Sequence, residues 1–231
     1  ANQIGGKLSK NKPCQIIHFK MNSDLLKEKA RNNKVTITTY ILSKMFLSLR
    51  YSTEDVNGEF NIQVPVNMRK FYPSKTIRNF SMYCGIRIPI SDIDNNKNIL
   101  NNISKQLENK TSFESMSNML INTKKMINAL KFIPLKVKNI VAKFSYGFLG
   151  DKIFTTTLSN IGVIDIPKGL EKYIESMDFV LGQSLSNRVS CGMITCNNTT
   201  TFSITKMTKD PSFEESLFNL LKENKQEDIL I

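Results

Sequence analysis

The sequence predicts an α/β domain in which a mixed sheet is covered by helices. Several segments alternate apolar and polar residues, as half-buried strands do, and others repeat apolar residues every three or four positions, as helices do. These segments follow the order strand, two helices, two strands, two or three helices, a cluster of strands and a last helix. The 231 residues, 40% of them hydrophobic, suffice for one domain or for one lobe of a larger enzyme.

The first half of the chain contains the clearest strands. Residues 14–21 are typical of a strand, after which Asn22 caps a helix. Residues 36–50 repeat apolar side chains at helical spacing. Residues 60–68 then alternate apolar and polar side chains, and residues 81–90 form the next strand.

The second half begins with a long helical region, which Pro134 interrupts. This region runs from about residue 92 to about residue 149. A terminal helix beginning near Ser212 closes the chain. The strands expected between them span residues 153–158, 178–181, 188–196 and 200–206.

Apolar faces interleaved with lysines mark the helical region. The expected faces consist of Leu120, Lys124, Ile127 and Leu130, and then of Leu135, Val137, Ile140, Val141 and Phe144. A basic amphipathic helix binds a membrane surface or a partner. We favour the alternative, a core helix with a solvated basic face. No apolar run approaches the ~18 residues of a membrane span, so we expect none.

The opening residues 1–12 are polar and contain glycine, so we expect a linker or lead-in segment there. Residues 13–231 are expected to form one unit, because no internal repeat or shift in composition divides them. The cysteines Cys14, Cys84, Cys191 and Cys196 lack the His/Cys cluster of a zinc site. We therefore expect no metal, and buried reduced thiols in a cytoplasmic protein.

The chain is strongly basic, with a formal net charge of +12. Its lysines are spread along the sequence without a block of five or six like charges. General surface composition is the simplest explanation, a mouth that attracts the phosphates of coenzyme A is the second, and nucleic-acid binding is the third. No aromatic-rich basic strand suited to stacking bases is present, so we expect no nucleic-acid partner.

The usual catalytic motifs are absent from the sequence. It contains no P-loop, no GxGxxG and no GxSxG. His18 is the one histidine, and it lies inside an expected strand without an acidic sequence neighbour. We expect a structural or surface histidine, and a general base is the alternative.

Three stretches in order carry a resemblance to a known family. They are VPVNMRKFYPSKTIRNF at 64–80, TTLSNIGVID at 156–165 and SNRVSCGMITCNNTTTFSITK at 186–206. The chain resembles the carboxyl-terminal half of alcohol acetyltransferase-like proteins, in the superfamily of chloramphenicol acetyltransferase and condensation domains. The resemblance implies a single lobe of the chloramphenicol acetyltransferase-like fold, α/β with a mixed, mainly antiparallel sheet covered by helices.

The resemblance also implies a function. Such enzymes move an acetyl or acyl group from coenzyme A, or from a carrier thioester, to an alcohol or amine, with acyl-CoA as co-substrate and no covalently bound cofactor. A histidine of an HHxxxDG motif in the amino-terminal lobe removes the acceptor's proton. That motif is absent here. We therefore expect a truncated, inactive carboxyl-terminal lobe; a natural single-lobe relative is the alternative.

Individual residues match the family's pattern. Arg69 and Asn79 correspond to its VPVxxR…N element. The resemblance implies that Asn79 lines the tunnel or forms a turn, and that Arg69 forms a structural ion pair. Ser159 and Asn160 end the expected strand, where they either donate to an oxyanion or terminate the strand.

The stretch DFVLG is similar to the family's DFGWG element. Asp178, Phe179 and Gly182 match it, whereas the middle glycine and the tryptophan are missing. The resemblance implies a structural role for these residues. It also suggests a tunnel floor at Gln183, Ser184 and Ser186.

Competing functions use the same lobe differently. A non-catalytic module would bind an acidic carrier domain or another partner through its positive charge. An isolated lobe would expose the apolar face that meets its partner lobe, so we expect self-association.

Overall fold

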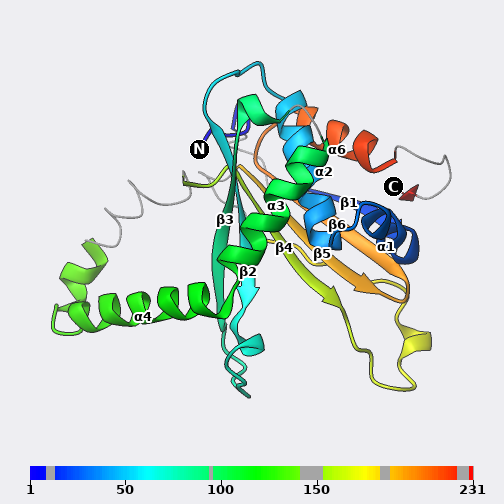
Figure 1. The fold of residues 1–231 in the computed structure, drawn as a ribbon. Coiled ribbons are helices and arrows are strands. Elements are labelled where there is room, and N and C mark those ends of the chain that lie inside the picture. The colour runs from blue at the N-terminus through cyan, green and yellow to red at the C-terminus, as the bar shows by residue number, and fades with distance from the viewer. Residues whose placement is uncertain (9–13, 94–95, 141–152, 183–187, 223–228, 231) are drawn as a thin grey trace.

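A mixed sheet runs through the computed structural model of the chain (Figure 1). The structure describes residues 1–8, 14–93, 96–140, 153–182, 188–222 and 229–230. The strands are β1 (Gln15–Asn22), β2 (Glu59–Asn67), β3 (Ser81–Pro89), β4 (Thr156–Val163), β5 (Val189–Cys196), β6 (Thr199–Lys206) and β7 (Ile229–Leu230). Among the described residues they pair in the order β3-β2-β4-β5-β6-β1-β7. Only the β2–β4 and β4–β5 pairs are parallel, which confirms the predicted mixed, mainly antiparallel sheet.

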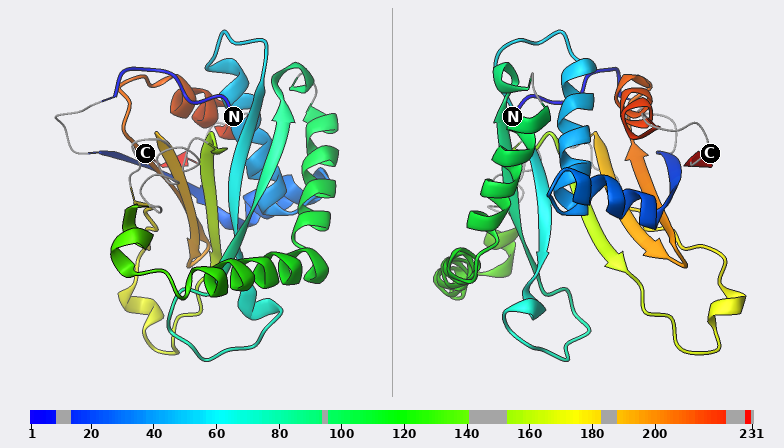
Figure 2. Two further views of the ribbon diagram at one scale, coloured as in Figure 1. Left: turned by 90° about the vertical axis from the view of Figure 1, so that its left-hand side faces the viewer. Right: turned by 45° about the vertical axis from the view of Figure 1, so that its right-hand side comes forward.

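A layer of helices covers one face of this sheet, and the core lies between them (Figure 2). The helices are α1 (Ser23–Asn32), α2 (Ile37–Tyr51), α3 (Asn96–Lys110), α4 (Phe113–Leu130) and α6 (Ser212–Lys222), and residues 135–140 are also helical. The side chain of Thr36 accepts a hydrogen bond from the Thr39 N–H and so caps α2. In α2, Ile41, Met45 and Phe46 are fully buried. Each such side chain contributes about 1.5–3 kcal/mol through burial.

The sheet divides where β2 meets β4. These two strands pair over only two residues each, and Gln63–Thr157 is the last pair. Beyond it, β2 stays paired with β3 as far as Asn67, whereas β4 stays paired with β5 as far as Val163. The two parts of the sheet therefore diverge, as Figure 2 shows.

Residues 174–182, which we call the covering segment, lie against β5 and β6 on the face away from the helices. A Cβ atom added to Gly192 of β5 would lie 2.4 Å from the carbonyl oxygen of Phe179. The hydroxyl of Thr205 in β6 donates to the carbonyl oxygen of Leu181 at 2.9 Å. A glycine at position 192 therefore lets the segment approach the sheet closely.

Two of the expected strands need correction. Residues 178–181 are not a strand, because they belong to the covering segment, which contacts a sheet face whose strands are already paired on both sides. The strand expected at 153–158 begins only at Thr156 and continues to Val163. A bulge lets it run past the polar residues that were expected to end it.

Helix α4 extends past the edge of the sheet (Figure 1). Met116 is its one buried residue. The expectation of an inward apolar face is therefore wrong, since Ile127 is 59% exposed and Leu135 in the following helical stretch is 71% exposed. Val141 and Phe144 lie outside the described residues. No helix in the described ranges is both long and apolar enough to cross a membrane.

The opening residues 1–8 pack on the body of the molecule. Ile4 is buried, and the Thr155 hydroxyl donates to the carbonyl oxygen of Asn2 at 2.7 Å. Arg188 donates to the carbonyl oxygen of Ile4 at 2.9 Å. The expected loose lead-in is therefore wrong for these eight residues, because distant side chains bind their backbone; residues 9–12 lie outside the described part.

Candidate functional site

Ser159 and Asn160 lie on β4 just beyond the point where the sheet divides. Ser159 follows the last β2–β4 pair, Gln63–Thr157, by two residues. Ligands of open α/β sheets bind in crevices outside the carboxyl ends of parallel strands, and the parallel strands β2 and β4 separate toward their carboxyl ends. The strand continues through a bulge between Asn160 and Gly162, and bulges of this kind re-aim side chains beside functional sites.

The hydroxyl of Ser159 makes no hydrogen bond to the part of the chain that the structure describes. Ser159 is half-buried and lies on the same face of β4 as Thr157. The Thr157 hydroxyl donates to Gln63 Oε1 at 3.0 Å, across the last contact between the two parts of the sheet. Ser159 therefore offers a free donor and acceptor beside this contact.

Both the nitrogen and the oxygen of the Asn160 side-chain amide form hydrogen bonds. Its Nδ2 donates to the hydroxyl of Thr38 in the first turn of α2 at 3.1 Å, and its Oδ1 accepts from the Gly162 N–H at 2.9 Å. Gly162 has φ +88°, a conformation that glycine adopts readily. Asn160 thus ties the bulge to α2 and keeps one N–H for another acceptor.

Arg69 and Asn79 flank the connection between β2 and β3. Asn79 is exposed, and its Oδ1 accepts from the Ser81 hydroxyl at 2.7 Å. The Arg69 Nη2 donates to the carbonyl oxygens of Thr76 at 2.7 Å and Arg78 at 2.8 Å. The predicted Arg69 ion pair is wrong within the described residues, because the guanidinium closes the loop through carbonyl oxygens. The structure does not join either residue to the β4 pair by a hydrogen bond.

His18 shares a row of the sheet with Ser159. The strand register aligns Ser159, Gly192, Ser203 and His18. Three strand spacings of ~4.8 Å separate the two ends of this row by ~14 Å. His18 Nδ1 lies 2.9 Å from the hydroxyl oxygen of Ser203, which is 1% exposed. This pairing supports a structural role for His18.

The residues of the DFVLG stretch belong to the covering segment. Phe179 lies over Gly192, whereas Asp178 is exposed and no atom comes within 4 Å of a Cβ added to Gly182. The close Phe179–Gly192 contact supports the structural role that the resemblance implies. The suggested floor residues Gln183, Ser184 and Ser186 lie outside the described residues.

Sequence reasoning missed a pocket of about 580 Å³ at the start of α2. Arg31 lines it from the last turn of α1, Lys34 from the turn before α2, and Glu108 from α3. The first turn of a helix favours anions, and the two cations add to this preference while Glu108 opposes it. The pocket joins segments far apart in the chain, so no local pattern predicts it.

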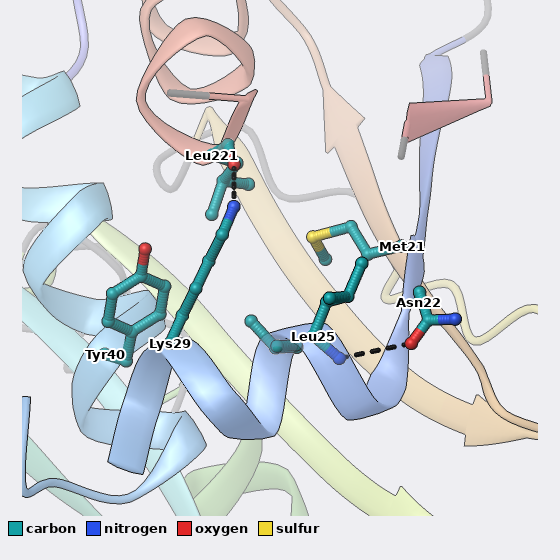
Figure 3. Close-up of a pocket in the computed structure, with 7 residues that line it drawn as sticks. Met21, Asn22, Leu25, Lys29, Tyr40 and Leu221 are labelled. Carbon is teal, nitrogen blue, oxygen red and sulfur yellow. Dashed lines mark hydrogen bonds between the residues drawn. The ribbon is translucent and has the colours of Figure 1, made fainter. Parts of the chain in front are cut away.

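A second pocket, between α1, α2 and α6, is too small for a substrate (Figure 3). Its volume of about 30 Å³ holds about one water molecule. Lys29 Nζ donates to the carbonyl oxygen of Leu221 at 3.1 Å, and Asn22 Oδ1 accepts from the Leu25 N–H at 3.1 Å (Figure 3). These bonds join α1 to its neighbours, so the pocket is a packing feature.

The four cysteines are free thiols. Cys84, Cys191 and Cys196 are buried as expected, whereas Cys14 is half-buried. Burial raises the pKa of the Cys191 thiol far above its usual range, which keeps it protonated and unreactive. In the described residues, no three His, Cys, Asp or Glu side chains gather as metal ligands.

The chain matches the alcohol acetyltransferase family over residues 6–224. No curated protein sequence matches it.

Its fold is similar to that of several solved structures. TRI3 trichothecene 15-O-acetyltransferase from Fusarium sporotrichioides has 14% identity and a TM-score of 0.64, with 96% of this chain and 48% of that chain covered. The epimerization domain of the third module of tyrocidine synthetase B has 9% identity and a TM-score of 0.61, with 96% and 50% covered. The X-domain from teicoplanin biosynthesis, solved in complex with OxyB, has 7% identity and a TM-score of 0.59, with 96% and 48% covered.

The chain spans about half the length of these three structures, and at these identities the likeness shows the fold alone. The resemblance in the sequence and the predicted fold class are both confirmed. The chain belongs to the alcohol acetyltransferase family.

Proposed function

We propose that the chain is the carboxyl-terminal lobe of an acyltransferase that moves an acetyl or acyl group from coenzyme A, or from a carrier thioester, to an alcohol or amine. The family match over residues 6–224 carries this proposal. The position of Ser159, with a free hydroxyl where the sheet divides, supports it.

Acyl transfer needs a base and a site for an oxyanion. The acceptor's oxygen or nitrogen attacks the thioester carbonyl carbon while the base takes its proton. The carbon–sulfur bond then breaks, and the thiolate receives that proton. The hydroxyl of Ser159 is the donor offered to the carbonyl oxygen as its negative charge develops. Asn160, the next residue, lies on the opposite face of β4 and holds the strand against α2. Asn79, exposed in the β2–β3 loop, would line the path to this point.

The base would come from a second, amino-terminal lobe that carries the HHxxxDG motif. His18 is paired with Ser203 and lies ~14 Å along the sheet from Ser159, which supports an external base. The three solved structures compared above are each about twice as long as this chain, which also supports a second lobe. Exposed apolar side chains, Ile127, Phe132 and Leu135, offer this lobe a surface to cover.

The acyl donor would bring its phosphates to the pocket at the start of α2. Arg31 and Lys34 line this pocket, and the Thr38 hydroxyl in the same turn of α2 bonds to Asn160. One end of an extended thioester would thus bind cations while its other end approaches β4. Arg31→Glu is expected to raise the KM for acyl-CoA and leave kcat unchanged.

The test compares the 231-residue chain with a protein extended upstream by its own coding sequence. Thiol release from acetyl-CoA is measured with alcohol acceptors. We expect turnover by the extended protein, an HHxxxDG motif in the added sequence, and no turnover by the shorter chain. Turnover by the shorter chain that disappears in His18→Ala would contradict an external base. An extended protein that transfers no acyl group would contradict the acyltransferase.

A carrier- or partner-binding module is the second candidate. The net charge of +12 suits an acidic carrier, and the X-domain neighbour was solved bound to another protein. Titration calorimetry with a phosphopantetheinylated acidic carrier tests this function. Salt-sensitive binding by an extended protein that lacks transfer activity would favour the module over the enzyme.

A further inference from the structure

A cavity that the proposed acyl transfer does not use lies beside strand β3, and we call it the β3 pocket. Its volume is about 320 Å³. Asn61 of β2 and Gly85 of β3 line it from the sheet, and Met116 and Met119 line it from α4. It therefore lies between the sheet and α4, the helix that extends past the sheet edge.

Asn61 places an unpartnered acceptor in this lining. The residue is fully buried, and its Nδ2 donates to the carbonyl oxygen of Ile153 at 2.9 Å. Its Oδ1 has no hydrogen-bond partner in the described part of the chain. Buried polar atoms are nearly always paired, so an orphan acceptor indicates a missing donor.

The lack of a side chain at Gly85 keeps this acceptor uncovered. A Cβ atom added there would lie 2.6 Å from Asn61 Oδ1 and 3.1 Å from Cε1 of Phe154. Gly85 has no positive φ, so the backbone conformation does not require glycine. Gly85 instead leaves space beside the Asn61 amide, which a Cβ atom would fill.

The remaining lining is mostly apolar, and its cations already have partners. Arg87 lines the pocket with its Nη1 paired to Glu59 Oε1 at 2.7 Å. Tyr83 and Phe154 meet edge to face with ring centroids 5.7 Å apart, which adds aromatic surface to the two methionines. Lys110 Nζ already donates to the carbonyl oxygen of Gly85 at 2.6 Å and to Gln106 Oε1 at 2.8 Å. Burial lowers the pKa of Lys110 and raises that of the Cys84 thiol, so the surroundings disfavour ions of either sign.

We propose that the β3 pocket binds a small neutral molecule that has an apolar body and an N–H or O–H donor, such as a primary amide or an alcohol. The donor bonds to Asn61 Oδ1, and the apolar body packs between Met116, Met119 and Phe154. The pocket adjoins Thr155, because the Thr155 hydroxyl accepts a hydrogen bond from the backbone N–H of Asn61. Ser159 follows Thr155 by four residues of extended chain, which at 3.3 Å per residue is ~13 Å. The pocket is thus separate from the proposed acyl-transfer site and does not depend on it.

The experiment uses two matched probes, hexanamide and N,N-dimethylhexanamide, which lacks an N–H. Binding is followed on the 231-residue chain by NMR of ¹³C-methyl methionine. We expect hexanamide to shift the Met116 and Met119 signals saturably and to bind about tenfold more tightly than the dimethyl probe. No saturable shift, or equal affinity for the two probes, would overturn the proposal and leave water as the partner of Asn61.

Variants locate the site. Gly85→Ala fills the space above Asn61 and is expected to abolish the shifts of both methionine signals. Met119→Phe fills the pocket from α4 and should do the same, which keeps the test decisive if Gly85→Ala does not fold. Met126→Phe, on the exposed part of α4, is the matched control and should bind hexanamide normally. Normal binding by folded Met119→Phe would place the probe elsewhere and contradict the proposal.

Discussion

The free hydroxyl of Ser159 is the residue-scale feature on which the proposed chemistry depends. In the extended two-lobed protein, Ser159→Ala is expected to lower kcat about 10²-fold, since one donor to the developing oxyanion is lost. The KM values should change little, because the bond strengthens only in the transition state. Steady-state kinetics check this, with Ser91→Ala, at an exposed serine beyond the end of β3, as control. An unchanged kcat would remove Ser159 from the mechanism.

Gly192 allows the covering segment to pack closely against β5. Gly192→Ala would place a Cβ atom 2.4 Å from the Phe179 carbonyl oxygen, so the segment must move. We expect a loss of about 1–3 kcal/mol in the free energy of unfolding, as for other overpacked contacts. Chemical denaturation measures it. Gly182→Ala in the same segment meets no atom within 4 Å and should be nearly neutral; equal losses would show that the contact is unimportant.

Asp210 stabilises the start of α6 as an ionised carboxylate. The Ser212 hydroxyl and N–H donate to it and lower the pKa of Asp210. Because the folded-state pKa lies below the unfolded value, this stabilisation is complete above pH ~4 and is lost as the pH falls through the lowered pKa. Asp210→Asn should cost about 0.5–1 kcal/mol at pH 7.

Denaturant titrations across pH check this dependence. The difference between Asp210→Asn and the unmodified chain should shrink below pH ~4. Asp178→Asn, at an exposed carboxylate, is the control and should change stability little at either pH. A difference that grows toward acid would contradict the assigned direction of the pKa shift.

Lys206 shows where reasoning from single residues fails. The lysines of a basic chain are expected at the surface, yet Lys206 is only 1% exposed and donates to Glu214 and to the Asp210 carbonyl oxygen. Buried charges persist where they are paired and hydrogen-bonded. The partners lie on α6 and the segment before it, so the pairing follows from how α6 packs on the sheet.

At the scale of elements, α4 is a helix as predicted, but its apolar side chains are unexpectedly exposed. Met126 and Ile127 are each 59% exposed. We expect the 231-residue chain to self-associate through this surface, because burying exposed apolar area is favourable. Ile127→Glu should lower the apparent mass in light scattering at high concentration, whereas Lys125→Glu should not. A monomeric unmodified chain would contradict this prediction.

Alternation predicted β2 and β3 well, because each strand has a core face and an outer face, so its sequence records the burial. Part of the covering segment has the composition of a strand without being one. Its residues 178–181 are largely apolar, but they pack on a sheet face and pair with no strand. Apolar composition alone does not distinguish these two arrangements.

At the scale of the whole molecule, a second lobe should change the behaviour of the exposed surface. The extended protein is expected to remain monomeric at concentrations at which the 231-residue chain associates, because the proposed second lobe would cover the α4 surface. Light scattering on both proteins makes the comparison. Equal association of the two would show that the second lobe leaves α4 exposed.

The sequence by itself determined most of the order of helices and strands, the α/β class and the family, because hydrophobic period, caps and motif order are local properties. Only the tertiary structure decided where the sheet divides, which hydroxyl stays free, and how Asn61 and Gly85 form a pocket. These features depend on contacts such as Gln63–Thr157, between residues 94 positions apart, and no local pattern encodes such a pairing.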